Sequence, residues 1–359
     1  MRFIFYYLIW KLIFVDLVKL PLKSENNSTY TVQFTLGLSQ ITLPITLDSN
    51  KIIMNEEMYD NKISSTSVLK DSNHYTIIYG TINIKTYEDI IHISSSVSTA
   101  INFVVIESNS LLIKNTIGFG LSPVPPKDNE SFIYQLKDKN YINSLGFTIV
   151  PDDSIFFGDV PKDIVNNMKY KGKVKVKSYE SNWNCNLTKI KVNGYIYNNI
   201  VPTIFQTKDH FILVPSTFYI FLRNNYFNEY ISNNQCTEHR VISIPPIIIC
   251  NCDIIPTLPF IEFIFDDVSF KIEPSLLFFK GKDKCNLHII VNDKTQWEFG
   301  TLFLNQMVSH FDINDKSITF YSNNIMISTK YYKTIVIICI VQYVVMIITI
   351  IFLLNYKLI

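Results

Sequence analysis

The sequence predicts a mainly β protein built from two related lobes. Alternating β-branched, aromatic and polar residues, the pattern of half-buried strands, recur in segments 30–38, 75–84, 101–108, 172–179, 189–197, 261–272 and 286–293. The clearest helix candidates are short, at 132–138 and 301–308. The Asn-rich segment 223–234 is typical of a surface loop.

The number of lobes follows from a weak internal duplication. In the first half, ITLPITLDSNK at 41–51 places an acidic turn after a strand, and TIGFG follows at 116–120. In the second half, TIFQTKDHF at 203–211 and WEFGTLF at 297–303 repeat this order. A strand, a polar turn and a later apolar pair before glycine, occurring twice, predict two lobes of the same design.

Composition excludes several classes of function. The chain has 359 residues, of which 48% are hydrophobic, enough for two core-forming domains or one large bilobal unit. Its 32 basic and 31 acidic residues nearly cancel, and no basic stripe interleaved with aromatics occurs, so we expect no nucleic-acid partner. Glycine-rich phosphate loops are absent, and Cys250 and Cys252 are too close for a zinc site. We expect no cofactor and no metal.

Both ends of the chain predict a membrane protein. Residues 334–354 contain no charge and, at about 1.5 Å per residue, can cross a bilayer core of about 30 Å. A basic residue before an apolar run makes 1–20 a predicted signal peptide. The first lobe is then 21–165, the second 166–329, and 330–359 holds the span and a short tail. We expect a single-pass type I protein of the secretory pathway or cell surface, although two lysines before the span and one after it favour the opposite orientation.

The six cysteines fit an oxidising compartment without forcing a dense disulfide framework. One of them, Cys339, lies within the predicted span. The other five are an odd number, so at least one is expected to stay unpaired.

Six motifs in the correct order resemble the pepsin-like aspartic peptidase family over nearly all of the chain between its two ends. LPITLDSN resembles the first hydrophobic-hydrophobic-Asp-Thr-Gly turn, IIYGT the flap hairpin, and NTIGFGLSP the Asp-Gly-Ile-Leu-Gly-Leu-Gly segment. SLGFTIV with SIFFGDVPKD resembles the strand pair that closes the first lobe, and NWNCNLTKIKVNG the opening of the second. The strongest match, at 297–320, is WEFGTLFLNQMVSHFDINDKSITF, which resembles the family's terminal segment.

The resemblance implies a bilobal pepsin-like fold, with peptide or protein extended in a cleft between the lobes. Each lobe of the family contributes one aspartate, and two carboxylates about 3 Å apart share a proton and activate a water. Asp48 occupies the place of the first aspartate. Tyr79 and Gly80 match the flap, which closes over substrate, although an ordinary strand tyrosine is the alternative. The family's cysteine spacing implies a disulfide between Cys252 and Cys285.

The second turn lacks the aspartate that the resemblance requires. In the family a proline follows that aspartate by nine residues, and Pro215 lies nine residues after Gln206. Asp209 can take the place of Gln206 only by drawing a residue of the apolar strand into the turn, which the strand pattern opposes. Because Gln206 cannot exchange a proton with Asp48, we expect the acid–base cycle to fail.

Other residues of the two turns are partly kept. Ser49 and Thr207 retain hydroxyls where the family uses a threonine pair to lock the turns together. Asn50 and Lys208 replace the turn glycines. Lys208 either lies near Asp48 and neutralises it or is solvated.

Three functions are compatible with these features. The first is a membrane-anchored, monomeric pepsin-like protein that is catalytically impaired and binds peptide or protein through the cleft, with Asp48 and Gln206 at its centre. Its expected ligand-binding residues are Ser49, Tyr79, Gly80 and Thr207. The second is a divergent, active aspartic endopeptidase that uses Asp209, or Asp48 alone at acidic pH. The third is a structural surface protein whose cleft has closed.

Overall fold

The computed structural model describes residues 18–25, 29–77, 80–93, 97–107, 116–124, 131–176, 182–241, 244–281, 283–292 and 294–329. Lys19 and Leu20, the last two residues of the predicted signal peptide, begin the first strand, while 1–17 lie outside the described residues. The predicted span, 334–354, and Cys339 also lie outside them. Within the described residues, no helix combines the length and the apolar character that crossing a bilayer requires.

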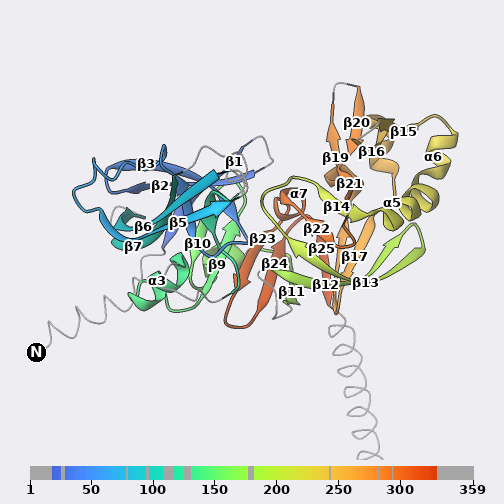
Figure 1. The fold of residues 1–359 in the computed structure, drawn as a ribbon. Helices are drawn as coiled ribbons and strands as arrows, with labels where there is room; N and C mark the ends of the chain where they lie inside the picture. The colour runs from blue at the N-terminus through green and yellow to red at the C-terminus, as the bar shows by residue number, and fades with distance from the viewer. Residues whose placement is uncertain are drawn as a thin grey trace, which may run out of the picture.

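The largest sheet has 13 strands in the order β11-β24-β23-β9-β10-β1-β2-β3-β8-β4-β7-β6-β5. Its strands are β1 (Lys19–Glu25), β2 (Thr29–Leu36), β3 (Ser39–Thr46), β4 (Ile52–Asn55), β5 (Val68–Ile77), β6 (Gly80–His92), β7 (Ser98–Glu107), β8 (Gly118–Gly120), β9 (Gly146–Val150), β10 (Ser154–Phe157), β11 (Tyr170–Lys175), β23 (Val308–Asp312) and β24 (Ser317–Ser322). Because β23, from the second half of the chain, pairs with β9 from the first, this sheet joins the two lobes (Figure 1).

The second lobe is built on an eight-stranded sheet in the order β21-β14-β22-β13-β12-β17-β18-β25. These strands are β12 (Asn184–Val192), β13 (Tyr195–Phe205), β14 (Ile212–Pro215), β17 (Ile261–Phe265), β18 (Val268–Ile272), β21 (Ile289–Asn292), β22 (Trp297–Phe299) and β25 (Met326–Thr329). A four-stranded sheet adds β15 (Cys236–Val241), β16 (Ile244–Asn251), β19 (Phe278–Lys280) and β20 (Lys284–Leu287). The expected mainly β architecture is therefore confirmed.

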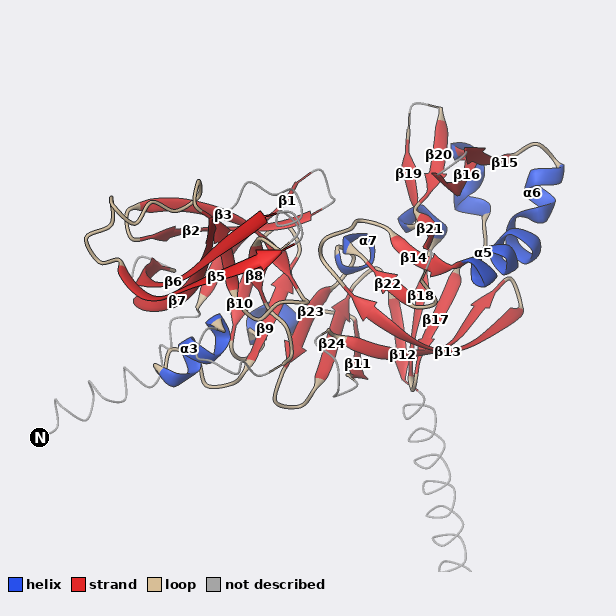
Figure 2. Cartoon of the chain, in the orientation of Figure 1, coloured by secondary structure: helices blue, strands red, loops and turns tan. Residues whose placement is uncertain are grey.

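Helices are short and few among the described residues (Figure 2). They are α3 (Phe132–Asp138), α4 (Lys162–Val165), α5 (Ser216–Leu222), α6 (Asn228–Ser232) and α7 (Thr301–Leu304), with a π-helical turn η1 (Arg223–Phe227) and 3-10 turns η2 (Cys252–Thr257) and η3 (Pro274–Leu276). Both predicted helices are present, as α3 and the shorter α7. The predicted loop at 223–234 is wrong, because buried Tyr226 and Phe227 anchor it as η1 and α6.

An aromatic cluster fills the junction between the lobes. Phe147 of β9 stacks on Phe311 of β23, with ring centroids 4.6 Å apart, and Trp183 meets Phe311 edge-on at 4.9 Å. The indole N–H of Trp183 donates a 2.8 Å hydrogen bond to the carbonyl of Leu121, so this fully buried side chain has no unpaired polar atom. Packing and hydrogen bonding together hold the second lobe against the first.

Two disulfides stabilise the second lobe. Cys252 and Cys285 are joined, as the resemblance implied, and close a loop with a sequence separation of 33 residues. Restricting the unfolded chain by a loop of this size contributes about 3 to 4 kcal/mol. The second disulfide, between Cys236 and Cys250, joins facing residues of β15 and β16. Cys185 is buried and free.

We predict that a buried histidine makes the junction acid-sensitive. His310 of β23 is buried, and its Nδ1 lies 2.9 Å from the hydroxyl oxygen of Thr148. Burial lowers the pKa of His310 to about 4. Since the unfolded chain then binds the proton more readily, stability is lost as the pH falls from about 6.5 towards 4, by roughly 3 kcal/mol in total.

Urea unfolding at pH 7.0 and pH 4.5 measures this loss. His310→Gln is expected to lose less stability between the two pH values than the parent, because its side chain does not titrate. His239→Gln, at an exposed position, is the control for removing a histidine as such. An unchanged pH dependence in His310→Gln would contradict the prediction.

Candidate functional site

The first turn lies between β3 and β4 and is held against β8. Ile45 of β3 lies opposite Phe119 in parallel pairing, and Ile52 of β4 lies opposite the same residue in antiparallel pairing. The backbone N–H of Gly120 donates a 3.0 Å hydrogen bond to the carbonyl of Lys51. Six residues, 46–51, therefore lie between the two residues that pair with Phe119, and we count them as the turn, although the first of them, Thr46, is also the last residue of β3.

The second turn, between β13 and β14, has the same arrangement against β22. Phe205 of β13 and Ile212 of β14 both lie opposite Phe299, one in parallel and one in antiparallel pairing. The N–H of Gly300 donates a 3.1 Å hydrogen bond to the carbonyl of Phe211. This turn also has six residues, 206–211, so the two turns correspond one to one.

Glycine is required where each turn meets its supporting strand. A Cβ added to Gly120 would lie 2.4 Å from the carbonyl oxygen of Lys51. A Cβ added to Gly300 would lie 2.2 Å from the carbonyl oxygen of Asp209. Both contacts are with backbone atoms, which cannot move aside as a flexible side chain can. The apolar-apolar-Gly pattern in the sequence thus marks the closest approach of backbone to backbone in each lobe.

This correspondence changes the expected equivalence between the lobes. We expected Asp48 to be the counterpart of Gln206. Because the two turns are equal in length, the counterpart of Gln206 in the first lobe is instead Thr46, two residues before Asp48. The equivalent pairs are Thr46 with Gln206, Leu47 with Thr207, and Asp48 with Lys208. The slip arises because Ile45 and Leu47 are both apolar, and a shift of two residues preserves the faces of a strand.

Thr46 is therefore the residue of the first lobe that matches Gln206. Its side chain is 2% exposed, and its hydroxyl has no hydrogen-bond partner among the described residues. A threonine hydroxyl does not ionise at any pH that proteins tolerate, and neither does the amide of Gln206. The two equivalent positions thus carry no carboxylate.

Two contacts join the turns across the lobes. The hydroxyl of Thr207, whose side chain is fully buried, donates a 2.6 Å hydrogen bond to the carbonyl of Ile45. Lys208 Nζ lies 2.7 Å from Asp48 Oδ2, so the two counterpart residues form an ion pair. Both side chains are more than a third exposed, which makes this pair a modest contributor to stability.

Only one hydroxyl, that of Thr207, takes part in the expected contact that locks the two turns together. Leu47, the counterpart of Thr207, is buried and has no hydroxyl to donate. Ser49 lies further along the turn, and its oxygen accepts a 3.3 Å hydrogen bond from the N–H of Lys51 within the same turn. The structure therefore does not bring Ser49 and Thr207 together as a pair.

Gln206 belongs to a polar network on the floor of the site. Its Nε2 donates to Asp209 Oδ2 at 3.0 Å and to Glu298 Oε2 at 3.3 Å. Glu298 is buried and also binds Lys294, whose Nζ lies 2.9 Å from Oε1, and this hydrogen bond raises the pKa of Lys294. Sequence reasoning missed Glu298, although a carboxylate inside the apolar motif WEFG was a usable signal.

A cavity of about 260 Å³ lies over this network and is lined by both lobes. Asp48 and Leu47 come from the first turn, and Gln206, Lys208 and Asp209 from the second. The carboxylate of Asp48 binds an ammonium group and that of Asp209 binds an amide. The cavity is polar, and its acidic groups are held by cations and amides instead of by one another.

A second cavity, of about 490 Å³, also borders the second turn, through His210. It is lined by Asp152 of the first lobe and, in the second lobe, by His210 and His288, whose ring centroids are 5.0 Å apart, and by Phe279, which stacks on His288. Burial, with a smaller contribution from His210, lowers the pKa of His288 to about 4. At neutral pH the ring of His288 is therefore uncharged, and it adds to the aromatic lining that Phe279 provides.

The expected flap is a hairpin of β5 and β6. These strands pair antiparallel, with Ile77 opposite Gly80, the first residue of β6. Tyr79 lies outside the described residues. The described residues contain no group of three or more histidine, cysteine or acidic side chains placed to hold a metal ion.

We predict that the hydrogen bond of Thr207 is required for stability. Thr207→Val keeps the shape of the side chain but leaves the buried carbonyl of Ile45 without its donor, which costs about 1 to 3 kcal/mol. Thr203→Val is the matched control, because Thr203 is equally buried and its hydroxyl has no partner among the described residues. Chemical denaturation measures both variants. An equal effect of the two substitutions would show that the bond between the lobes contributes nothing.

Comparison with known proteins identifies the family. The family model described as eukaryotic aspartyl protease matches residues 25–322, which is most of the chain and covers both turns. A comparison with curated proteins gave no match. The duplicated turns, the sheet that joins the lobes and this match agree, and the chain belongs to the eukaryotic aspartyl protease family.

Proposed function

We propose that this protein is a catalytically inactive member of the aspartyl protease family that binds peptide or protein segments between its lobes. The observation that carries the proposal is the correspondence of the two turns, which puts Thr46 and Gln206 at equivalent positions. Family chemistry needs two carboxylates that share a proton and activate a water. A hydroxyl and an amide cannot supply that proton exchange.

The nearby carboxylates do not replace the missing pair. The carboxylate of Asp48 forms an ion pair with Lys208, and that of Asp209 accepts from Gln206. Glu298 is held by Lys294, Gln206 and Gln296. Each of these three carboxylates is engaged by a lysine or an amide, and the family's mechanism requires two carboxylates that share a proton with each other.

Peptide binding does not depend on the lost chemistry. An extended peptide can pair with exposed strand edges through main-chain hydrogen bonds, while cavities receive alternate side chains. The two cavities border the same turn, because Asp209 lines one and His210 the other. The polar cavity suits a hydrogen-bonding side chain, and the cavity of Phe279, Phe278 and His288 suits an aromatic or aliphatic one.

We further propose that the protein is tethered to a membrane of the secretory pathway or cell surface by the segment 334–354. The support is the uncharged apolar sequence of that segment, which lies outside the described residues. Retention of the full chain in the membrane pellet after alkaline extraction is the expected result. Release into the supernatant would contradict the tether and leave the proposal for the cleft untouched.

Peptidase assays test the loss of catalysis. The full chain is incubated with a mixed peptide library from pH 3 to 7, with and without a statine-type inhibitor. We expect no inhibitor-sensitive cleavage. Such cleavage by the parent protein would contradict the proposal and support the active endopeptidase instead.

A pair of designed variants tests, in the same assay, which residue of the first turn is the counterpart of Gln206. One variant carries Thr46→Asp and Gln206→Asp, with Asp48→Gly and Lys208→Gly to open the turns. The other keeps Asp48 and carries Gln206→Asp, Asn50→Gly and Lys208→Gly. We expect peptidase activity to return only in the first variant. Activity confined to the second variant would show that Asp48 is the counterpart of Gln206 after all. Thermal unfolding checks that both variants fold.

Binding of uncut peptide tests the second half of the proposal. We expect the detergent-solubilised full chain to retain a subset of library peptides at pH 7, and Phe279→Ala to weaken retention of those with aromatic or aliphatic side chains. Phe260→Ala is the control, since Phe260 is similarly exposed but lines neither cavity. Retention of no peptide by the folded parent would favour a structural surface protein with an unused cleft.

A further inference from the structure

One row of side chains crosses the outer face of the second lobe. Cross-strand pairing sets its members directly opposite one another on β13, β12, β17, β18 and β25: Ile196, Lys191, Glu262, Lys271 and Met326. Directly paired residues of neighbouring strands point to the same face of a sheet. The intervening residues, such as Val192, Phe263, Phe270 and Ile327, point to the other face and are buried in the core.

The outer face combines exposed apolar side chains with lysines. Ile196 is 54% exposed and Met326 is 45% exposed. Phe260, just before β17, is 46% exposed, and Lys271 Nζ lies 4.7 Å from the centre of its ring. Ile196 and Met326 lie at the two ends of the row, with Lys191, Glu262 and Lys271 between them, so apolar side chains border the charged ones across this face.

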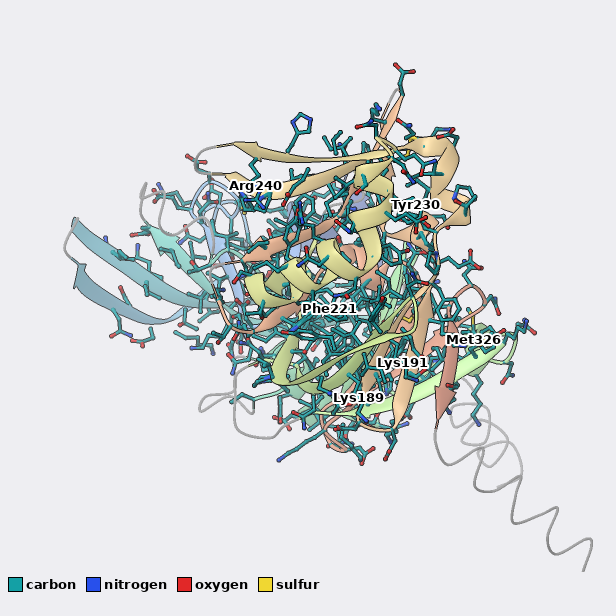
Figure 3. All side chains as sticks on the ribbon, turned by 90° about the vertical axis from the view of Figure 1, so that its right-hand side faces the viewer. Lys189, Lys191, Phe221, Tyr230, Arg240 and Met326 are labelled. Atoms are coloured by element: carbon teal, nitrogen blue, oxygen red, sulfur yellow. A yellow bond between two sulfur atoms is a disulfide. The ribbon has the colours of Figure 1, made fainter. Side chains whose placement is uncertain are left out.

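The charge of this face is positive. Lys189 and Lys191 project from β12 on the same side, and Lys271 lies beside Phe260. Glu262 offsets one of these charges, because its carboxylate lies 3.2 Å from Lys191 Nζ. Figure 3 shows Lys189, Lys191 and Met326 on one part of the surface. A patch of lysines around apolar side chains matches the chemistry of phospholipid headgroups above an acyl layer.

The position of this face in the chain points to the same partner. β25 is the edge strand of the sheet and ends at Thr329. Only four residues separate Thr329 from the apolar segment 334–354, and four residues span at most about 14 Å. If that segment is the tether, the end of β25 and its neighbours must lie close to the bilayer.

We propose that the outer face of β13, β12, β17, β18 and β25 rests on the membrane surface. Its lysines then lie at lipid phosphates, and Phe260, Ile196 and Met326 lie among the headgroups. This inference rests on the tether proposed above. This contact would fix the orientation of the second lobe relative to the bilayer, because a lobe held by a sheet face cannot rotate freely about a single linker.

Headgroup quenching tests the orientation. The full chain is reconstituted into vesicles that contain a phospholipid with a nitroxide on its headgroup, and a tryptophan is added by Phe260→Trp. We expect the nitroxide to quench the added emission. Phe279→Trp is the matched control, because Phe279 is 56% exposed but lies in β19 of the four-stranded sheet. The three native tryptophans, Trp10, Trp183 and Trp297, are common to the two variants, so a difference in quenching between the variants comes from the added tryptophan.

Equal quenching at the two positions in protein that stays in the membrane would overturn the orientation while leaving the tether intact. A second set of variants adds Lys189→Gln, Lys191→Gln and Lys271→Gln to Phe260→Trp, and we expect a loss of quenching. Release of the full chain by alkaline extraction would overturn this inference together with the tether, whereas peptide binding would stand. If the emission of the Phe260→Trp variant is not quenched, and the protein forms dimers as its density in the vesicles increases, this face contacts a second copy of the chain instead.

Discussion

The hydrogen bond from the buried hydroxyl of Thr207 to the carbonyl of Ile45 is the constraint on which the site depends. It links the ends of β13 and β3, which pair with the short strands β22 and β8. β8 ends at Gly120, and Gly300 directly follows β22. Because both turns have six residues, this single bond sets which side chains of one lobe face which of the other. The chemistry of the cleft follows from that correspondence and not from the nearest acidic residue in the sequence.

A polar network lies at the centre of the site, where the two turns meet. Lys208 neutralises Asp48, and Gln206 bridges Asp209 and Glu298. A buried carboxylate such as Glu298 is tolerated because Lys294 and two amides satisfy its oxygens. Such a network holds a fixed pattern of donors and acceptors, which is the property that the proposed binding of peptide requires.

Much of the fold was predictable, because strand alternation and ordered motifs are local signals. The Cys252–Cys285 disulfide also followed from the resemblance. The segment 223–234 was not predictable as helix, since its asparagines suggest a loop and only tertiary burial of Tyr226 and Phe227 overrides them.

The site was predictable in its location but not in its register. Ile45 and Leu47 both fit the inward face of a strand. The sequence alone therefore allows the first turn to be aligned with the second so that Asp48 matches Gln206, whereas pairing with β8 shifts this alignment by two residues. Thr46 lies inside the motif LPITLDSN and Glu298 inside WEFG, but neither residue was recognised as part of the site. The placement of both residues in the site depends on pairing between strands that are far apart in the sequence, and no short stretch of sequence contains that information.

A crystal structure of the protein's two turns would test the central claim most directly. The account predicts the hydroxyl of Thr207 on the carbonyl of Ile45, Lys208 on Asp48, and the side chain of Thr46 at the position equivalent to Gln206. A hydroxyl of Thr207 bonded instead to the carbonyl of Leu47, with the carboxylates of Asp48 and Asp209 in contact, would contradict it.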